Sequence, residues 1–279
     1  MRLGVVGHVE WVDFLVCEHL PRPGEIHHVR SAHEAPGGGG AMGAYALGSI
    51  AGAATFYCAV GDDHRARLTA EGLRAAGLDV RAAVRAGTPQ RRVVTFLTDD
   101  GERTITVLGD RLVPHGDDDL PWDELAAFDG IYLTAGDAGA VRAARQARVL
   151  VATPRARDPI LAAGVAVDVL VGSAIDPDER VDEELRAAAR PRYIVQTEGP
   201  AGGSWRAADG TEGRWAATPP PGPPVDGYGC GDAFAAALTA ALAAGRSIDE
   251  ACRLAAPAGA ALLCERAPAV GDLSRVVDL

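Results

Sequence analysis

Short apolar runs alternate with alanine-rich stretches of helical length along most of this 279-residue chain, and this alternation is what most constrains its fold. The apolar or β-branched runs, which we expect to be strands, are residues 3–6, 55–60, 93–97, 130–134, 149–152, 167–171 and 193–196. The alanine-rich stretches are residues 41–52, 64–76, 138–147, 180–189, 233–244 and 249–265. Such alternation favours an α/β fold in which helices cover both faces of a mostly parallel central sheet.

Two segments interrupt this alternation. Residues 8–36 contain strand-like runs at 11–16 and 26–30, and residues 80–108 contain three more. Those three runs are 82–85, 92–98 and 104–108, with a hairpin-like turn at 99–102. No helical stretch lies beside them to cover them. We therefore predict a small β-sheet that acts as a lid over a site on the main sheet, inserted in a single domain that spans residues 1–279.

The composition excludes several classes of protein. A net charge of −11 argues against binding to nucleic acid or to an anionic membrane surface, and no apolar run approaches the roughly 18–20 residues that span a bilayer. The five cysteines form no C-x-x-C pair, which fits a reducing cytoplasm and argues against a zinc site. The histidines show no metal-binding spacing, so we expect His27, His28 and His64 to be exposed surface residues.

All 27 basic residues are arginines. A Walker A loop requires lysine, and so does Schiff-base chemistry, so both are excluded. If the chain handles phosphate, the positive charge must come from backbone N–H groups, arginine and a metal ion.

Residues 226–232, with the sequence Asp-Gly-Tyr-Gly-Cys-Gly-Asp, form a glycine-rich turn that opens a helix. The free N–H groups and the dipole of the first helical turn favour an anion. Asp232 there suits a base that deprotonates a hydroxyl attacking a phosphate, but aspartate is also a favoured N-cap. Cys230 is either a reactive thiol or a small residue that fills the turn. The segment alone leaves both choices open.

Two further glycine-rich loops carry weaker signals. Residues 37–40 are four glycines that open a helix, and residues 197–203 follow a strand end, where open α/β sheets place their ligands. The glycines at 37–40 alone would support a nicotinamide-dependent oxidoreductase. That class needs its fingerprint directly after the first strand, where the chain has only Gly-His-Val-Glu at 7–10.

The order of these three loops resembles that of the ribokinase-like (PfkB) carbohydrate kinase family, over nearly the whole chain. The N-terminal signature of that family is similar to residues 37–63, and its C-terminal signature, D-T-x-G-A-G-D-x-F, is similar to residues 226–234. The resemblance implies a three-layer α/β/α ribokinase-like fold with a β-sheet lid. It also implies transfer of the γ-phosphate of ATP, with Mg²⁺, to a hydroxyl of a sugar or sugar-like molecule, and a homodimer formed through the lid.

The resemblance also implies roles for individual residues. Asp232 would be the catalytic base, and the anion hole would be the backbone of Gly229, Cys230 and Gly231. The substrate would lie against Gly38, Gly39 and Met42, with Asp13 or, in its place, Glu10 binding its hydroxyls. The nucleotide would contact Thr197, Gly199 and Gly202.

Several positions depart from the family pattern. Ribokinase has Lys and Asn where this chain has Gly39 and Met42, and because methionine cannot donate a hydrogen bond, ribose itself is a doubtful substrate. The N-x-x-E element tied to Mg²⁺ appears only as Ser-Ala-Ile-Asp at 173–176, so that Asp176 keeps the carboxylate. Asp226 would help to hold a monovalent cation such as K⁺.

Three alternatives stay open at this stage. A nucleoside kinase would share the fold. A non-catalytic sugar or nucleotide sensor is suggested by Met42 and the altered N-x-x-E element. Finally, Arg91, Arg92 and Arg103 either pair a phosphate already on the substrate or are ordinary exposed charges of the lid.

Overall fold

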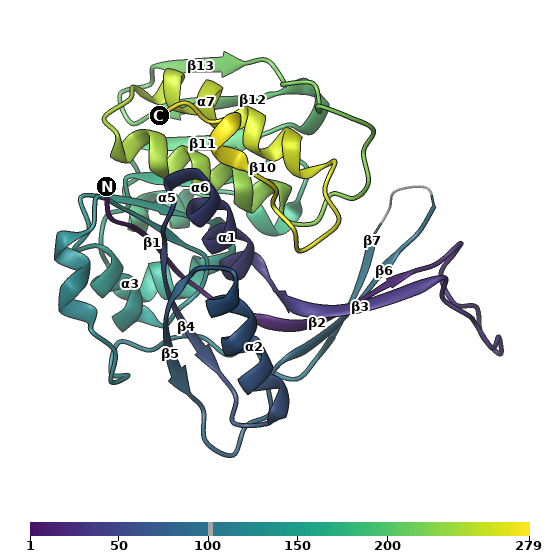
Figure 1. Cartoon of the computed structure of the whole chain (residues 1–279). Helices are drawn as coiled ribbons and strands as arrows, with labels where there is room; N and C mark the ends of the chain where they lie inside the picture. Colours follow the sequence, from purple (N-terminus) through teal and green to yellow (C-terminus); the bar gives the residue numbers. More distant parts are fainter. Residues whose placement is uncertain (100–102) are drawn as a thin grey trace.

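The computed structural model describes residues 1–99 and 103–279, and its strands form two sheets (Figure 1). The larger sheet has nine strands in the order β13-β12-β11-β10-β9-β8-β1-β4-β5. Their bounds are β1 (Leu3–Val6), β4 (Thr55–Val60), β5 (Asp79–Val84), β8 (Gly130–Leu133), β9 (Val149–Ala152), β10 (Val169–Ser173), β11 (Tyr193–Thr197), β12 (Gly203–Ala207) and β13 (Glu212–Trp215). Strands β5 to β11 of this order pair in parallel, and only β12 and β13 are antiparallel. The predicted mostly parallel sheet is confirmed.

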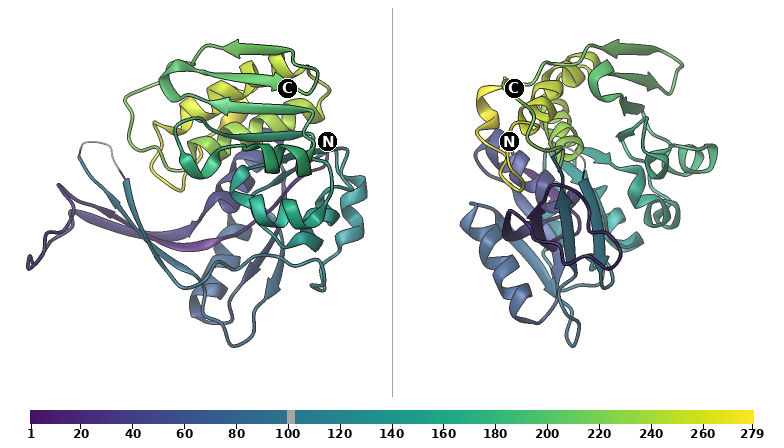
Figure 2. Two further views of the ribbon diagram at one scale, coloured as in Figure 1. Left: turned by 180° about the vertical axis from the view of Figure 1, so that it is seen from behind. Right: turned by 90° about the vertical axis from the view of Figure 1, so that its right-hand side faces the viewer.

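Helices cover both faces of this sheet (Figure 2). They are α1 (Gly39–Ala51), α2 (His64–Ala75), α3 (Ala138–Ala144), α4 (Arg157–Ala163), α5 (Glu183–Ala189), α6 (Cys230–Ala243) and α7 (Ile248–Leu262). Val5 belongs to the buried cluster formed with α1, α6 and α7, whereas the next residue, Val6, belongs to the cluster formed with α3, α4 and α5. Because central strands are buried on both faces, they have the continuous apolar sequences from which they were predicted.

The smaller sheet has the order β3-β2-β6-β7 and projects from the rest of the molecule (Figures 1 and 2). Its strands are β2 (Glu10–Val16), β3 (Ser31–Gly37), β6 (Arg92–Leu97) and β7 (Arg103–Leu108). Strands β2 and β6 pair in parallel, and the two outer pairs are antiparallel. The predicted small sheet is therefore present. Part of the predicted turn at 99–102, residues 100–102, lies outside the described residues.

Two expected strands are placed differently. Residues 26–30 lie in the loop between β2 and β3, because pairing of Val16 with Ser31 makes the second strand begin later. Residues 82–85 fall at the end of β5, which pairs with β4 in the large sheet and not in the lid. Residues 93–97 fall within the run at 92–98 that was predicted for the lid, and they form most of β6 in the small sheet as expected. Within the described ranges, no helix is long and apolar enough to cross a membrane.

Two glycines begin the helices that define the site. Gly38 precedes α1 with φ 87° and Gly229 precedes α6 with φ 79°, a left-handed conformation that glycine adopts without strain. Helices α1 and α6 pack against each other. Their first turns therefore lie together where β1 continues into the small sheet.

Candidate active site

A cavity of about 830 Å³ lies between the carboxyl ends of the central strands and β7 of the small sheet. It brings together most of the residues predicted from sequence, namely Gly38, Gly39, Met42, Asp176, Thr197, Gly199, Gly229, Cys230, Gly231 and Asp232. Three predicted residues do not line it: Asp13, Gly202 and Asp226. Side chains that sequence reasoning did not assign to the site also face the cavity, among them His8, Arg111, Tyr132, Arg155, Glu179 and Tyr228.

Asp232, the predicted base, is the third residue of α6, and its side chain does not cap the helix. Gly229 occupies the N-cap position without a side-chain hydrogen bond. The Asp232 carboxylate instead accepts a hydrogen bond of 3.0 Å from the Tyr132 hydroxyl. Burial raises the pKa of Asp232 to about 7, although the hydrogen bond from Tyr132 acts in the opposite direction. This carboxyl therefore titrates in the pH range where a general base works best.

Glycine lets the start of α1 approach this carboxyl closely. A Cβ atom at Gly39 would lie 2.9 Å from Asp232 Oδ1. The two loops are also tied together, because the backbone N–H of Gly38 donates a hydrogen bond of 2.7 Å to the Tyr228 hydroxyl. The first turn of α1 is consequently held beside the first turn of α6.

The glycine turn leaves the N–H groups at the start of α6 without a side-chain cap. Met42 packs directly against this turn, since a Cβ atom at Gly229 would be 2.6 Å from Met42 Cε. A Cβ atom at Gly231 would meet nothing within 4 Å, so the space beside that residue is open. Burial raises the pKa of the Cys230 thiol to about 12. The thiol is therefore protonated near neutral pH, which supports the interpretation that it fills the turn.

Glu10, the sequence alternative to Asp13, is the acid that faces the cavity. Its carboxylate lies 3.0 Å from Arg91 Nε, and both side chains are about nine-tenths buried. A Cβ atom at Gly38 would be 3.2 Å from the side chain of Glu10. Asp13 points elsewhere in the small sheet, where it accepts a hydrogen bond of 2.6 Å from Arg92.

An arginine-centred ion-pair group lies beside the glycine turn. Arg155, in a short 3-10 helix (Pro154–Ala156), binds Glu179 Oε1 at 2.7 Å and also pairs with Asp176. The other carboxylate oxygen of Glu179 accepts from the Ser173 N–H at 2.6 Å. The charges that act most strongly on Asp232 are those of Glu179, Arg155 and Arg103. Sequence spacing identified only Asp176 here, because Glu179 lies beyond the expected N-x-x-E span.

Asp226 and Gly202 serve the loops around the cavity. Both oxygens of the buried Asp226 carboxylate accept backbone N–H groups, from Tyr228 at 2.8 Å and Ala267 at 3.1 Å. Gly202 ends a 3-10 turn with φ 86°, and a Cβ atom there would be 2.1 Å from the Trp215 carbonyl oxygen. Both residues therefore hold in place loops that line the cavity, although neither residue lines it.

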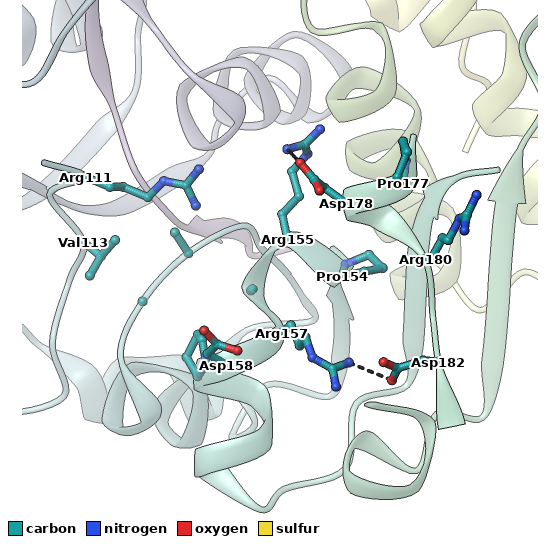
Figure 3. A pocket seen from close by; sticks show the side chains of 14 residues that line it. Arg111, Val113, Pro154, Arg155, Arg157, Asp158, Pro177, Asp178, Arg180 and Asp182 are labelled. Atoms are coloured by element: carbon teal, nitrogen blue, oxygen red, sulfur yellow. Dashed lines mark hydrogen bonds and ion pairs between the residues drawn. The ribbon is translucent and has the colours of Figure 1, made fainter. Parts of the chain in front are cut away.

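A second cavity of about 750 Å³ adjoins the first and is lined by Arg157, Asp158, Arg180 and Asp182, among others (Figure 3). Arg111 and Arg155 line both cavities. In Figure 3, Arg157 is paired with Asp182, at 2.7 Å.

The fold and this cavity define a kinase that transfers phosphate to a hydroxyl group. The sequence model of the pfkB family of carbohydrate kinases matches residues 2–164 and 166–272. The chain belongs to that family. It is therefore a phosphotransferase with an alcohol group as acceptor, in a family of ATP-dependent enzymes. Among curated proteins, no sequence matches the chain significantly.

Solved structures share the fold at low sequence identity. A ribokinase from Arabidopsis thaliana, complexed with ribose and ATP, is 20% identical with a TM-score of 0.74, covering 100% of this chain and 99% of its own. An adenosine kinase from Sinorhizobium meliloti is 20% identical with a TM-score of 0.77, covering 98% and 97%. Phosphofructokinase-2 from Escherichia coli, complexed with potassium, is 17% identical with a TM-score of 0.72, covering 99% and 97%. The ribokinase-like fold is thus confirmed, while these neighbours differ in acceptor.

Proposed function

We propose that this protein transfers the γ-phosphate of ATP to a hydroxyl of a carbohydrate or related small molecule, with Asp232 as the base. One observation carries the proposal. Asp232 lies in the first turn of a helix that has no side-chain cap, and it faces the cavity. Its carboxylate accepts a hydrogen bond from the Tyr132 hydroxyl and does not cap the helix. A buried carboxylate where an anion would gather raises the free energy of the fold, so a catalytic use explains its presence.

The reaction follows from the arrangement of these groups. As the acceptor oxygen attacks the γ-phosphorus, its proton passes to the Asp232 carboxylate. The bond from that phosphorus to the bridging oxygen breaks, and ADP leaves with the electron pair. The charge on the transferred phosphoryl oxygens meets the N–H groups of Gly229, Cys230 and Gly231. Arg103 lies close to this turn, since a Cβ atom at Gly227 would be 3.0 Å from Arg103 Nη1.

The nucleotide and metal are proposed to bind on the β10 and β11 side of the cavity. Thr197 and Gly199 line it and would contact ATP, with Gly202 behind them. Bound Mg²⁺ would neutralise phosphate charge during transfer. Asp176 and Glu179 are hard oxygen donors suited to that ion. Because Arg155 already pairs with both carboxylates, they would hold the ion through its water ligands.

The cation proposed at Asp226 has weaker local support. Both of its carboxylate oxygens already accept N–H groups, so K⁺ would have to share them with Tyr228 and Ala267. The phosphofructokinase-2 complexed with potassium shows that a protein of this fold can be crystallised with that ion.

The acceptor is proposed to lie against Gly38, Gly39 and Met42, between the glycine turn and β7. Glu10 would accept its hydroxyl groups from within the cavity, and Asp13 would support the lid from outside it. Because the acceptor is not fixed by the fold, a nucleoside acceptor is tested beside sugars.

We also propose that residues 1–279 form one domain whose small sheet is a lid, and that the protein works in the cytoplasm as a homodimer. All five cysteines are free thiols, as expected in a reducing compartment. The loop between β2 and β3 exposes the apolar side chains of Ile26 and Val29, which do not line the cavity and which pairing through the lid would cover.

The test is Asp232→Asn in an ATP-consumption assay with pentoses, hexoses, their phosphates, adenosine and guanosine. We expect turnover to fall by about 10²–10⁴-fold, the usual contribution of a general base, while ATP binding is kept. The matched control is Asp209→Asn, an exposed residue in the turn between β12 and β13. A fall of less than about tenfold would remove Asp232 as the base. ATP-independent sugar binding with no turnover across the panel would favour a sensor.

A further inference from the structure

Four arginines face the cavity: Arg91, Arg103, Arg111 and Arg155. Two of them are neutralised by carboxylates, Arg155 by Asp176 and Glu179, and Arg91 by Glu10. Arg111 differs from these two. In residues 1–99 and 103–279 it forms no ion pair, and Glu10 is the acid that acts on it. Its guanidinium is therefore charged and available to a ligand.

Arg111 lies near His8, on which it acts more strongly than any other charged residue does. The arginines that act most on Asp232 are Arg155 and Arg103, whereas Arg111 and Arg91 act most on His8. The His8 ring lies beside the proposed acceptor site, because a Cβ atom at Gly38 would be 3.2 Å from it. Arg111 also lines the neighbouring cavity (Figure 3), so its side chain lies where the two cavities meet.

The charge around His8 is unbalanced. Burial, and then Arg111 and Arg91, lower the pKa of His8 to about 3, so this imidazole is neutral. Its Nδ1 atom is buried without a hydrogen-bond partner in the part of the chain that is described. Among the described residues, the Glu10 carboxylate pairs with Arg91 and leaves Arg111 without an ion-pair partner. A single anionic group on a ligand would restore the balance and give Arg111 a partner, with Arg91 beside it.

We propose that the acceptor substrate carries an anionic group, a phosphate or a carboxylate, which Arg111 and Arg91 bind while its free hydroxyl faces Asp232. This rests on the proposed kinase function. Planar guanidinium groups bind either oxyanion through paired N–H donors, so the shared chemistry is an oxyanion on the same molecule as the reacting hydroxyl.

The experiment compares sugars with and without an anionic group at the terminal carbon: glucose, glucose 6-phosphate and glucuronate, then fructose with fructose 6-phosphate and ribose with ribose 5-phosphate. ATP consumption and ligand-induced change in Tm are both measured. We expect an anionic member to have at least about tenfold higher kcat/KM than its neutral partner. The phosphate and carboxylate arms identify which oxyanion is bound. Equal or better use of the neutral sugars would overturn the inference.

Arg111→Gln separates this site from the ATP site. The variant should raise the KM for the anionic acceptor by about tenfold or more and leave the KM for ATP within about twofold. Arg111→Lys, which keeps the charge but loses the planar fork, should recover part of the affinity. Arg275→Gln, whose side chain is 82% exposed near the C-terminus, is the control. An unchanged acceptor KM in Arg111→Gln would overturn the inference.

The binding arm keeps the two proposals apart. If no acceptor consumes ATP, the proposed function fails, but the Tm measurements still decide the inference. Stabilisation by sugar phosphates or glucuronate that Arg111→Gln abolishes would support it. Absence of stabilisation by any anionic sugar would overturn it.

A separate observation lies at the tip of the small sheet, in the loop between β2 and β3. His19, Glu25 and His27 each offer one ligand atom, and these atoms all lie within 4.8 Å of one another. Glu25 Oε1 is 3.7 Å from both His19 Nε2 and His27 Nδ1. His19 Nδ1 lies 2.8 Å from the carbonyl oxygen of Leu20. That contact assigns the proton to Nδ1, so Nε2 presents a lone pair to Glu25.

We infer that this group binds a divalent transition metal of the Zn²⁺ type. Two imidazoles and one carboxylate form a known three-ligand zinc set with a fourth position free. Ligands about 2.1 Å from a tetrahedral ion lie roughly 3.4 Å apart. Two of the three separations here are 3.7 Å and the third is within 4.8 Å, so a small movement of the loop would close the site around an ion. His27 and His19 are eight positions apart, which explains why no sequence motif indicated the site.

Titration of the tag-free protein with ZnCl₂, followed by calorimetry and Tm, tests this inference. We expect one Zn²⁺ per chain with micromolar or tighter affinity and a rise in Tm that MgCl₂ does not produce. His27→Ala should abolish binding, while His28→Ala, the neighbouring histidine outside the cluster, should keep it. Binding weaker than about 100 μM, or unchanged binding in His27→Ala, would overturn the inference.

Discussion

A buried carboxyl group at the start of α6 couples acid–base chemistry to stability in this protein. Asp232 is surrounded by protein, and its strongest polar partner is the Tyr132 hydroxyl. Burial favours the neutral form, whereas the proposed reaction uses the charged form. The same residue should therefore control both the pH dependence of turnover and the pH dependence of unfolding.

For turnover, kcat/KM should rise with pH and level off above about pH 7, because a base works only after losing its own proton. Tyr132→Phe removes the hydrogen bond that lowers this pKa, so the inflection should move to higher pH. Rates measured from pH 5.5 to 8.5 in both proteins check this. An inflection that stays in place in Tyr132→Phe would show that another group is titrating.

For stability, Asp232→Asn should raise Tm, and by more at pH 8 than at pH 5. The folded-state pKa of Asp232 lies above its unfolded value, so its contribution is fully present at low pH and is lost as pH rises through about 7. An amide at this position has no charge to bury. Thermal unfolding at both pH values measures the difference, and an equal gain at the two would contradict the assignment.

At the scale of elements, the site depends on two helices that begin side by side. Each begins at a glycine with positive φ, and Tyr228 links the two starts through the N–H of Gly38. Because Gly39 has no side chain, the start of α1 can approach the Asp232 carboxylate at the start of α6 this closely.

Gly39→Ala should lower kcat by at least about tenfold while Tm stays close to that of the wild type. The added methyl would lie 2.9 Å from Asp232 Oδ1 and displace the carboxylate. Gly48→Ala in the same helix is the matched control, since its methyl would meet only the end of the Leu78 side chain, at 3.2 Å. Steady-state kinetics beside thermal unfolding make the comparison, and wild-type kcat in Gly39→Ala would show that the contact is not needed.

The sequence predicted where helices and strands occur better than it predicted which strands pair with one another. Continuous apolar runs indicated the central strands because those strands are buried on both faces. The same signal could not say that residues 82–85, expected in the lid, pair with β4 in the large sheet, since pairing depends on distant residues. At the site, glycine spacing predicted the turn and Asp232. Arg155, Glu179 and Tyr132 could not be predicted, because they converge from two short 3-10 helices and a strand that are far apart in the sequence, and they carry no local motif.

For the whole molecule, the small sheet supplies one wall of the cavity. Strand β7 is exposed throughout, yet Ile105 and Val107 line the cavity. Leu108 is exposed to a similar degree but does not line it, as the alternation of side chains along a strand requires. The lid therefore contributes apolar contact to a ligand on one face of β7 only.

Val107→Ser should raise the acceptor KM several-fold and leave the KM for ATP nearly unchanged. Leu108→Ser, one residue away and on the other face, should leave both constants near wild type. Because both side chains are about half exposed, at 47% and 43%, neither change should lower Tm appreciably. Equal effects of the two substitutions on the acceptor KM would show that β7 acts through sheet stability and not through contact.

The arginines that face the cavity have a practical consequence. Guanidinium groups keep their protons throughout about pH 5 to 9, so the positive charge around the phosphate path is constant across any assay. The pH dependence of turnover therefore reflects the titration of groups other than the arginines, whose charge does not change over this range. With no lysine in the chain, its one primary amine is the N-terminal group. Reagents and acetyltransferases that acylate lysine side chains inactivate phosphate sites built on lysine. They have no target in this cavity.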